Sequence, residues 1–246
     1  MQALKVVKGL GPIDARRIGR HALLCWLIVL PVFVALAARW VLPLVLARVG
    51  ELIEQDLTAF SPAIAGCALL LIAPALCGMV IGFLLLDQRD DRTRIALQGT
   101  PMPLHSYLLY RLAAPMLISL AMTLVAFAVA GLLQIGVLPL LLAALSAAPL
   151  PPLVALALAS FAENKVQGFA LTKASGLLLI APLIAYFVRS NWQFAFGIVP
   201  TYWPSRLYWT MQAGERHALF YLLAGLLYHA LLLAALLRRF NRVMHQ

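Results

Sequence analysis

Few residues of this chain could carry out chemistry, because 63% of its 246 residues are apolar and only 11% are charged. His229 is the strongest candidate for an acid or base, since it lies midway along an apolar stretch. With a serine such as Ser119 or Ser146, it could serve an intramembrane enzyme. A neutral imidazole that is hydrogen-bonded to a neighbouring helix is the alternative that we favour. We therefore expect no catalytic residue in this chain.

The sequence lacks the motifs by which many enzymes and pumps bind nucleotides or metals. It has no glycine-rich phosphate loop ending in Gly-Lys-Ser/Thr, the usual cradle for ATP. It has neither a His-Glu-x-x-His zinc pair nor a Gly-x-Ser-x-Gly nucleophile turn. Its three cysteines lie in apolar stretches, where unreactive packing is expected: Cys25, Cys67 and Cys77. We therefore expect no metal and no cofactor in this chain.

The acidic residues avoid the centres of the apolar stretches. They are Asp14, Glu51, Glu54, Asp56, Asp87, Asp90, Asp91, Glu163 and Glu215. A carrier driven by protons or sodium usually needs a carboxylate at membrane depth to bind the coupling ion. The energy for any transport should therefore come from a separate subunit, and an ATPase is the natural supplier.

Six apolar stretches are long enough to position these residues as transmembrane helices. Each is close to the roughly 20 residues that cross a bilayer as a helix, and none alternates like a barrel strand. They span residues 22–38, 64–86, 112–133, 137–160, 171–188 and 217–237. The first could extend toward residue 49, either as one tilted helix or as a separate interfacial helix. The sequence therefore predicts an all-α integral membrane protein with a single domain over residues 1–246.

The lysines and arginines predict the orientation of these spans. Fourteen of the 19 lie on the side of the two termini, and the other five are Arg39, Arg48, Arg189, Arg206 and Arg216. Because cytoplasmic loops carry the excess of basic residues, both termini should be cytoplasmic. The basic residues are spread along the membrane flanks, so the net charge of +10 indicates contacts with lipid headgroups rather than nucleic acid.

Three segments outside the spans have a distinct composition. Residues 1–21 mix apolar and basic side chains, which is typical of an interfacial helix; a plain basic flank is the alternative. Its expected site residues are Asp14, Arg16, Arg17 and Arg20.

Residues 189–215 are rich in aromatic rings and predict short re-entrant outer helices before the last span, with a simple aromatic belt as the alternative. Their expected site residues are Trp192, Pro200, Tyr202, Trp203 and Trp209.

Residues 87–105 form the most charged segment of the chain. Opposite charges three or four residues apart favour a solvated helix, and Thr100-Pro101 should end it. This pattern predicts a short cytoplasmic helix that docks on a partner; an ordinary connecting loop is the alternative.

Three stretches resemble the type-2 permeases of ABC exporters. Residues 14–20 resemble that family's interfacial connecting helix. The clearest likeness is to the cytoplasmic coupling segment, where a charged helix precedes a Thr-Pro turn and a Tyr-Leu start of the third span. Residues 164–168, followed by Leu171, Lys173 and Pro182, are similar to permeases for fluoroquinolone or other drug export. The residues that the likeness assigns to ATPase coupling are Asp87, Arg89, Asp90, Asp91, Arg92, Thr93, Leu97, Thr100 and Pro101.

The resemblance implies that two permeases, identical or different, and two separate ATP-binding subunits form an exporter in the bacterial inner membrane. ATP and Mg would be bound by the partner subunits, whose closure would rock the permeases through the coupling segments. The substrate would be a hydrophobic or amphipathic drug, lipid or glycolipid, moved outward by alternating access. The coupling segment departs from the family in having Asp and Arg where Glu and Gly are common. An intramembrane enzyme that uses His229 and an accessory membrane scaffold remain the alternatives.

Overall fold

The protein is helical throughout the part of the chain that the structure describes. The structure is a computed structural model, and it describes residues 22–90, 104–188 and 190–244. The helices there are α2 (Ala22–Ile53), α3 (Ser61–Asp90), α5 (Leu104–Ala130), α6 (Val137–Ala147), α7 (Leu150–Phe161), α8 (Lys165–Phe187), α9 (Tyr202–Gln212) and α10 (Ala218–Met244). Short 3₁₀ turns connect some of them: η1 (Thr58–Phe60), η2 (Leu133–Ile135) and η3 (Asn191–Ile198).

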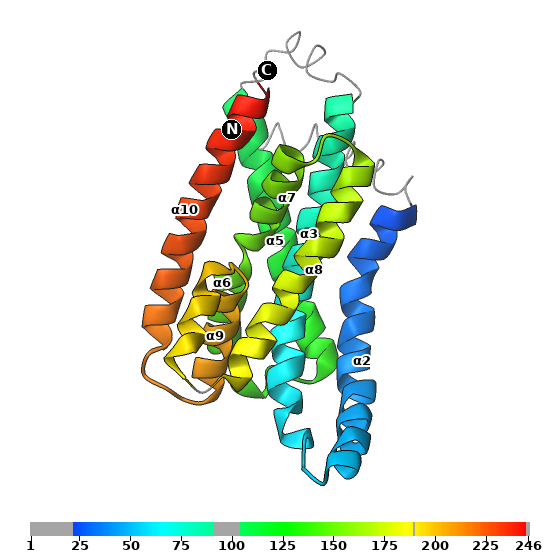
Figure 1. The fold of residues 1–246 in the computed structure, drawn as a ribbon, viewed down its shortest axis with the longest axis vertical. Coiled ribbons are helices and arrows are strands. Elements are labelled where there is room, and N and C mark those ends of the chain that lie inside the picture. The colour runs from blue at the N-terminus through cyan, green and yellow to red at the C-terminus, as the bar shows by residue number, and fades with distance from the viewer. Residues whose placement is uncertain (1–21, 91–103, 189, 245–246) are drawn as a thin grey trace.

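Six spans in these ranges are long and apolar enough to cross a membrane, which confirms the predicted fold class. Four lie within single helices, the second joins η1 to α3, and the fourth joins α6 to α7. They run side by side along the long axis of the molecule, and α2 begins at the same end at which α10 finishes (Figure 1). The extension of the first span is continuous, because α2 runs through Arg39 as far as Ile53.

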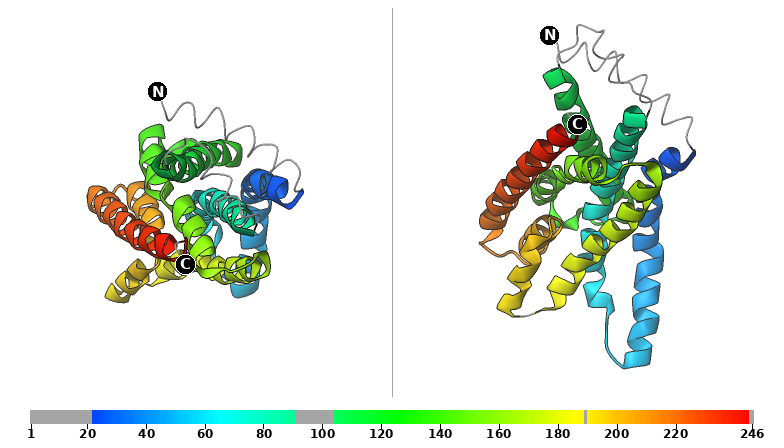
Figure 2. Two further views of the ribbon diagram at one scale, coloured as in Figure 1. Left: turned by 90° about the horizontal axis from the view of Figure 1, so that it is seen from above. Right: turned by 45° about the horizontal axis from the view of Figure 1, so that its top comes forward.

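Helix α3 is the centre of the bundle. It contacts α2, α5, α6, α7, α8 and α9, and the view along the helices shows the others arranged around it (Figure 2). Its closest neighbour is α7, which approaches at Gly78 and Gly82. A Cβ atom added at Gly78 would lie 2.7 Å from the carbonyl oxygen of Pro151, and one at Gly82 would lie 2.6 Å from Cδ1 of Leu158. The Gly-x-x-x-Gly spacing therefore permits the two backbones to pack closely.

The fourth span is broken, although its sequence predicts one helix over residues 137–160. α6 ends at Ala147 and α7 begins at Leu150. The cluster of prolines explains the break, because each lacks an N–H donor and fits best in the first turn of a helix. Isolated prolines, in contrast, are accommodated inside α2, α3, α5 and α8. Pro149 precedes α7, and Pro151 and Pro152 lie in its first turn.

Helix α9 lies inside the bundle between the lower parts of α8 and α10, at the end away from Met244 (Figure 1). The aromatic rings of α9 and η3 differ in burial. Tyr202, Tyr208 and Trp209 are buried among the helices, whereas Trp192 of η3 is exposed. The rings of α9 were expected at the lipid interface. They lie in the protein because α3 has small residues opposite them, among them Gly66, and this leaves room for the ring of Tyr208.

Two hydrogen bonds hold α9 to the start of α3. The indole nitrogen of Trp209 donates to the carbonyl oxygen of Ala63 at 3.1 Å, and the Tyr208 hydroxyl donates to that of Pro62 at 3.3 Å. These carbonyls belong to the first turn of α3. The short helix is thus a fixed part of the bundle rather than a surface loop.

Candidate functional site

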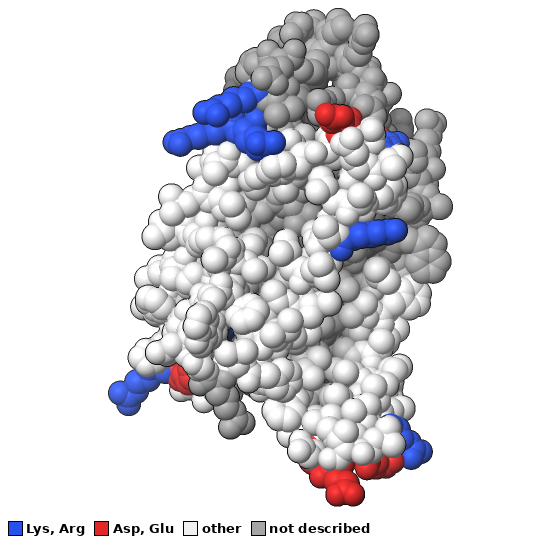
Figure 3. Space-filling view, in the orientation of Figure 1, with Lys and Arg blue, Asp and Glu red and all other residues white. Residues whose placement is uncertain are grey.

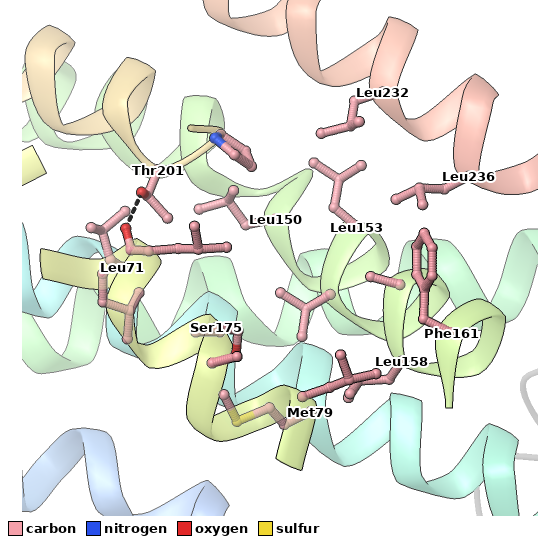
Figure 4. A pocket seen from close by; sticks show the side chains of 18 residues that line it. Leu71, Met79, Leu150, Leu153, Leu158, Phe161, Ser175, Thr201, Leu232 and Leu236 are labelled. Atoms are coloured by element: carbon pink, nitrogen blue, oxygen red, sulfur yellow. Dashed lines mark hydrogen bonds between the residues drawn. The ribbon is translucent and has the colours of Figure 1, made fainter. Parts of the chain in front are cut away.

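An apolar groove of about 460 Å³ lies between α8 and α10. Helices α3 and α7 form its floor, and Pro200 and Thr201 close one end. Its side chains point into a common space (Figure 4). Those labelled in the figure are Leu71, Met79, Leu150, Leu153, Leu158, Phe161, Ser175, Thr201, Leu232 and Leu236.

The groove exists because α8 and α10 are held apart. Both helices pack on α7 and on α9, whereas their described parts make almost no contact with each other. Leu178 and Leu179 of α8 line one side of the groove, and Leu232 and Leu236 of α10 line the other. The rim is partly open, since Leu178 of α8 and Phe161 at the end of α7 remain exposed.

The groove offers apolar surface without a free polar group. Its two hydroxyls are already used: Ser175 donates to the carbonyl oxygen of Thr172 at 2.8 Å, and Thr201 donates to that of Leu178. The second bond is the dashed line in Figure 4. No charged residue is among its described lining. The volume is that of a pocket for a drug-sized molecule, and its chemistry favours an apolar or amphipathic ligand, because a buried polar group without a partner is costly.

His229 lies behind the closed end of the groove and is fully buried. Its Nε2 atom is 2.9 Å from the carbonyl oxygen of Pro200, so the ring ties α10 to the segment before α9. The backbone of Ser146 is a further neighbour of the ring. The serine hydroxyls do not pair with it: that of Ser119 donates to Met116, and that of Ser146 has no hydrogen-bond partner among the described residues. The geometry is that of a structural histidine.

The predicted coupling segment is described only at its start. Asp87 lies near the end of α3 and pairs with Lys165 at the start of α8, with 2.6 Å between Oδ1 and Nζ. Arg89 and Asp90 fall in the last turn of α3. The remaining predicted residues lie outside the described ranges: Asp91, Arg92, Thr93, Leu97, Thr100 and Pro101. The interfacial residues Asp14, Arg16, Arg17 and Arg20 lie outside them too.

Charged side chains gather at the two ends of the molecule and leave a largely uncharged surface between them (Figure 3). Arg238, Arg239 and Arg242 are exposed near the end of α10, whereas Glu54 and Asp56 are exposed at the other end, after α2. This distribution is the one expected of a multi-pass membrane protein.

The family model described as "Fluoroquinolones export permease protein Rv2686c-like" matches residues 14–237. The chain belongs to this family of permeases. Two curated relatives carry the name fluoroquinolones export permease protein, one from Mycobacterium tuberculosis strain CDC 1551 / Oshkosh and one from strain ATCC 25618 / H37Rv. Each is 31% identical over 241 residues, which cover 96% of this chain and 94% of the relative. No solved structure shows a significant match to the chain.

The family confirms the resemblance to drug-export permeases. The groove of this permease was not predicted, because its lining comes from four helices and a connecting segment and forms no motif in sequence. Gly78 and Gly82 did carry a readable signal, since small residues four apart are typical of close packing between membrane helices.

Proposed function

We propose that this permease is the membrane-spanning subunit of an ATP-driven exporter and that the groove between α8 and α10 holds an apolar or amphipathic drug during export. The observation that carries the proposal is a groove of drug size without a free polar group in a member of a drug-export family. The names of the relatives make a fluoroquinolone the first substrate to test.

The energy would come from separate ATP-binding subunits, which bind ATP and Mg. This chain has no phosphate loop and no carboxylate at the centre of a span. Residues 87–105 would dock on the ATPase, while residues 1–21 would lie along the inner surface of the bacterial inner membrane, with both termini cytoplasmic. A second permease, identical or different, would complete the transporter, and ATP-driven closure would change the access to the groove.

The groove can be tested by filling it. Ala157 lies on its floor in α7, so Ala157→Phe should occupy the space that a ligand needs. Ala230 is exposed on α10 and does not line the groove, so Ala230→Phe adds the same bulk elsewhere. Cells would coexpress the permease with its ATP-binding subunit at equal membrane abundance, and the measurement is the intracellular level of fluorescent norfloxacin.

We expect wild type and Ala230→Phe to lower the intracellular norfloxacin and Ala157→Phe to lose most of that effect. A Walker lysine substitution in the ATP-binding subunit should abolish export in all three. Export that survives the ATPase substitution would contradict the energy source. Normal export by Ala157→Phe would contradict the assignment of the groove. A chain that exports nothing in any combination would favour the accessory scaffold.

A further inference from the structure

A second cavity, of about 470 Å³, lies at the other end of α9 and has a different chemistry. Pro200 and Thr201 precede α9 and close the apolar groove, whereas Gln212 and Ala213 at the end of α9 line this cavity. We call it the arginine cavity, because Arg206 is the basic residue of its described lining. The segment before α9 thus lines the groove, and α9 itself lines the arginine cavity.

Aromatic rings from three elements form one wall of the arginine cavity: Phe60, Tyr186, Phe187 and Trp209. The ring centroids of Phe60 and Phe187 are 5.5 Å apart, and those of Tyr186 and Phe187 are 5.2 Å apart. Tyr186 also lies 4.8 Å from Trp209. The planes of these three ring pairs are inclined at 64°, 89° and 53°, so the wall offers both edges and faces for contact with the planar ring of a ligand.

Arg206 supplies the positive charge. Its guanidinium carbon lies 5.3 Å from the centroid of the Tyr221 ring, which holds one side of the group. Its Nε atom is buried and faces the protein, so a ligand can meet only the other, accessible part of the side chain. Arg206 is partly exposed and lines the cavity, and a guanidinium pairs best with a carboxylate.

Glu215 is the acidic residue of the lining, and it opposes a ligand anion. It is exposed, whereas Arg206 is only partly exposed. Water and salt screen the exposed charge more strongly than the partly buried one. The positive charge therefore dominates inside the cavity, and Glu215 weakens anion binding without reversing it.

We infer that the arginine cavity binds aromatic carboxylates, with the carboxylate on Arg206 and the ring on the aromatic wall. Binding of this kind needs only the permease. A role for the cavity on the route of the exported drug rests on the proposed function.

The test uses the purified full-length permease in lipid nanodiscs, with empty nanodiscs as the blank. The probes are 2-naphthoate and its neutral analogue 2-naphthamide, which share the ring and differ in the charge. We expect naphthoate to bind about tenfold more tightly than naphthamide, because a hydrogen bond to a charged group contributes that much. Arg206→Gln should remove this preference, whereas Glu215→Gln should tighten naphthoate binding alone. Arg216→Gln, which changes an exposed arginine outside the lining, should leave both affinities unchanged.

Arg206 also packs on Tyr221, so its replacement could disturb the fold. Ala213→Phe therefore fills the cavity with Arg206 intact and should weaken both probes, while the groove variant Ala157→Phe should weaken neither. Equal affinity of the wild type for the two probes would overturn the inference. The inference would also be overturned if Arg216→Gln lost the preference for naphthoate as fully as Arg206→Gln does. Weaker naphthoate binding in Glu215→Gln would overturn it as well. No ATPase is present, so a failure here leaves the proposed exporter untouched, and a failure of drug export leaves this site untouched.

Discussion

The ring of Tyr208 in α9 packs directly against Gly66 in α3. A Cβ atom added at Gly66 would lie 2.1 Å from the tyrosine hydroxyl oxygen and 2.2 Å from Cζ. Real atoms do not approach so closely, so even alanine would force the ring of Tyr208 away. That ring is buried, and its hydroxyl donates to the carbonyl oxygen of Pro62. A single hydrogen atom in place of a methyl group thus decides whether α9 can lie where it does.

We expect Gly66→Ala to destabilise the permease by about 1–3 kcal/mol, the usual cost of overpacking a core. The matched control is Gly176→Ala in α8, where an added Cβ atom meets nothing within 4 Å. This control should be neutral or gain about 0.5–1 kcal/mol, because alanine is the better helix former. The measurement is the midpoint of thermal unfolding in detergent. Equal unfolding midpoints for the two variants would contradict the close packing of Tyr208 in α9 against Gly66 in α3.

His229 gives a prediction that separates a structural role from a catalytic one. His229→Leu removes the hydrogen bond to Pro200 and should cost about 1 kcal/mol of stability. His229→Gln retains an N–H donor and should recover most of that stability together with normal drug export. Thermal unfolding and norfloxacin accumulation are measured on the same membranes. An intramembrane enzyme would show the reverse, with activity lost in both variants and stability unchanged in His229→Gln.

At the scale of elements, the apolar stretches predicted where the helices lie, since a chain in lipid must satisfy its backbone hydrogen bonds within each helix. The length of the first span and the break in the fourth were harder to predict. Arg39 suggested an end to the first span, yet its Nη1 atom donates to the carbonyl oxygen of Val129 at 3.0 Å, and α2 continues. Pro149 is compatible with a break, but prolines are also common inside membrane helices, so the sequence alone does not decide between a broken and a continuous span.

The end of α3 carries the prediction about the ATPase. Asp87 is held by Lys165, so the acidic residues that follow, Asp90 and Asp91, are the better candidates for contact with a partner. Asp90→Arg with Asp91→Arg should weaken docking, because a charge-assisted contact contributes about 1.5–3 kcal/mol, whereas the same residues in a solvated loop contribute little.

The measurements are pull-down of the ATP-binding subunit and drug-stimulated ATP turnover at equal membrane abundance. A charge reversal at Glu163 is the control and should change neither; Glu163 is exposed and lies two residues before Lys165, the partner of Asp87. Unchanged ATPase binding and unchanged ATP turnover in the double variant would show that residues 87–105 serve only as a connecting loop.

At the scale of the whole molecule, the orientation in the membrane is the broadest prediction. Helix α9, which ends at Gln212, lies at the end of the molecule opposite to the end of α10 (Figure 1). In a variant without the native cysteines Cys25, Cys67 and Cys77, Gln212→Cys should react with an impermeant thiol reagent in intact cells. Gln246→Cys should react only after the cells are made permeable. The opposite labelling pattern would show that the permease has the reverse orientation in the membrane.

The cavities show why the sequence predicted the family and the spans but neither binding site. Residues in and just before α9 contact residues that lie far away along the chain. Thr201 lines the groove together with α3, α7, α8 and α10, and Trp209 contacts Ala63 and Tyr186. No local pattern encodes such contacts. The sequence showed only that residues 189–215 were unusually aromatic, and this composition fits an interfacial belt as well as a buried helix.

The open rim of the groove has a consequence for how drug concentration is understood. If the groove holds the drug as proposed, a molecule dissolved among the lipid tails can reach it past Leu178 and Phe161 without returning to water. The relevant concentration is then that in the bilayer, which equals the aqueous concentration multiplied by the partition coefficient. Among drugs of equal fit, the apparent aqueous affinity should rise in proportion to lipophilicity, so the permease would discriminate partly through the solubility of its substrates in the membrane.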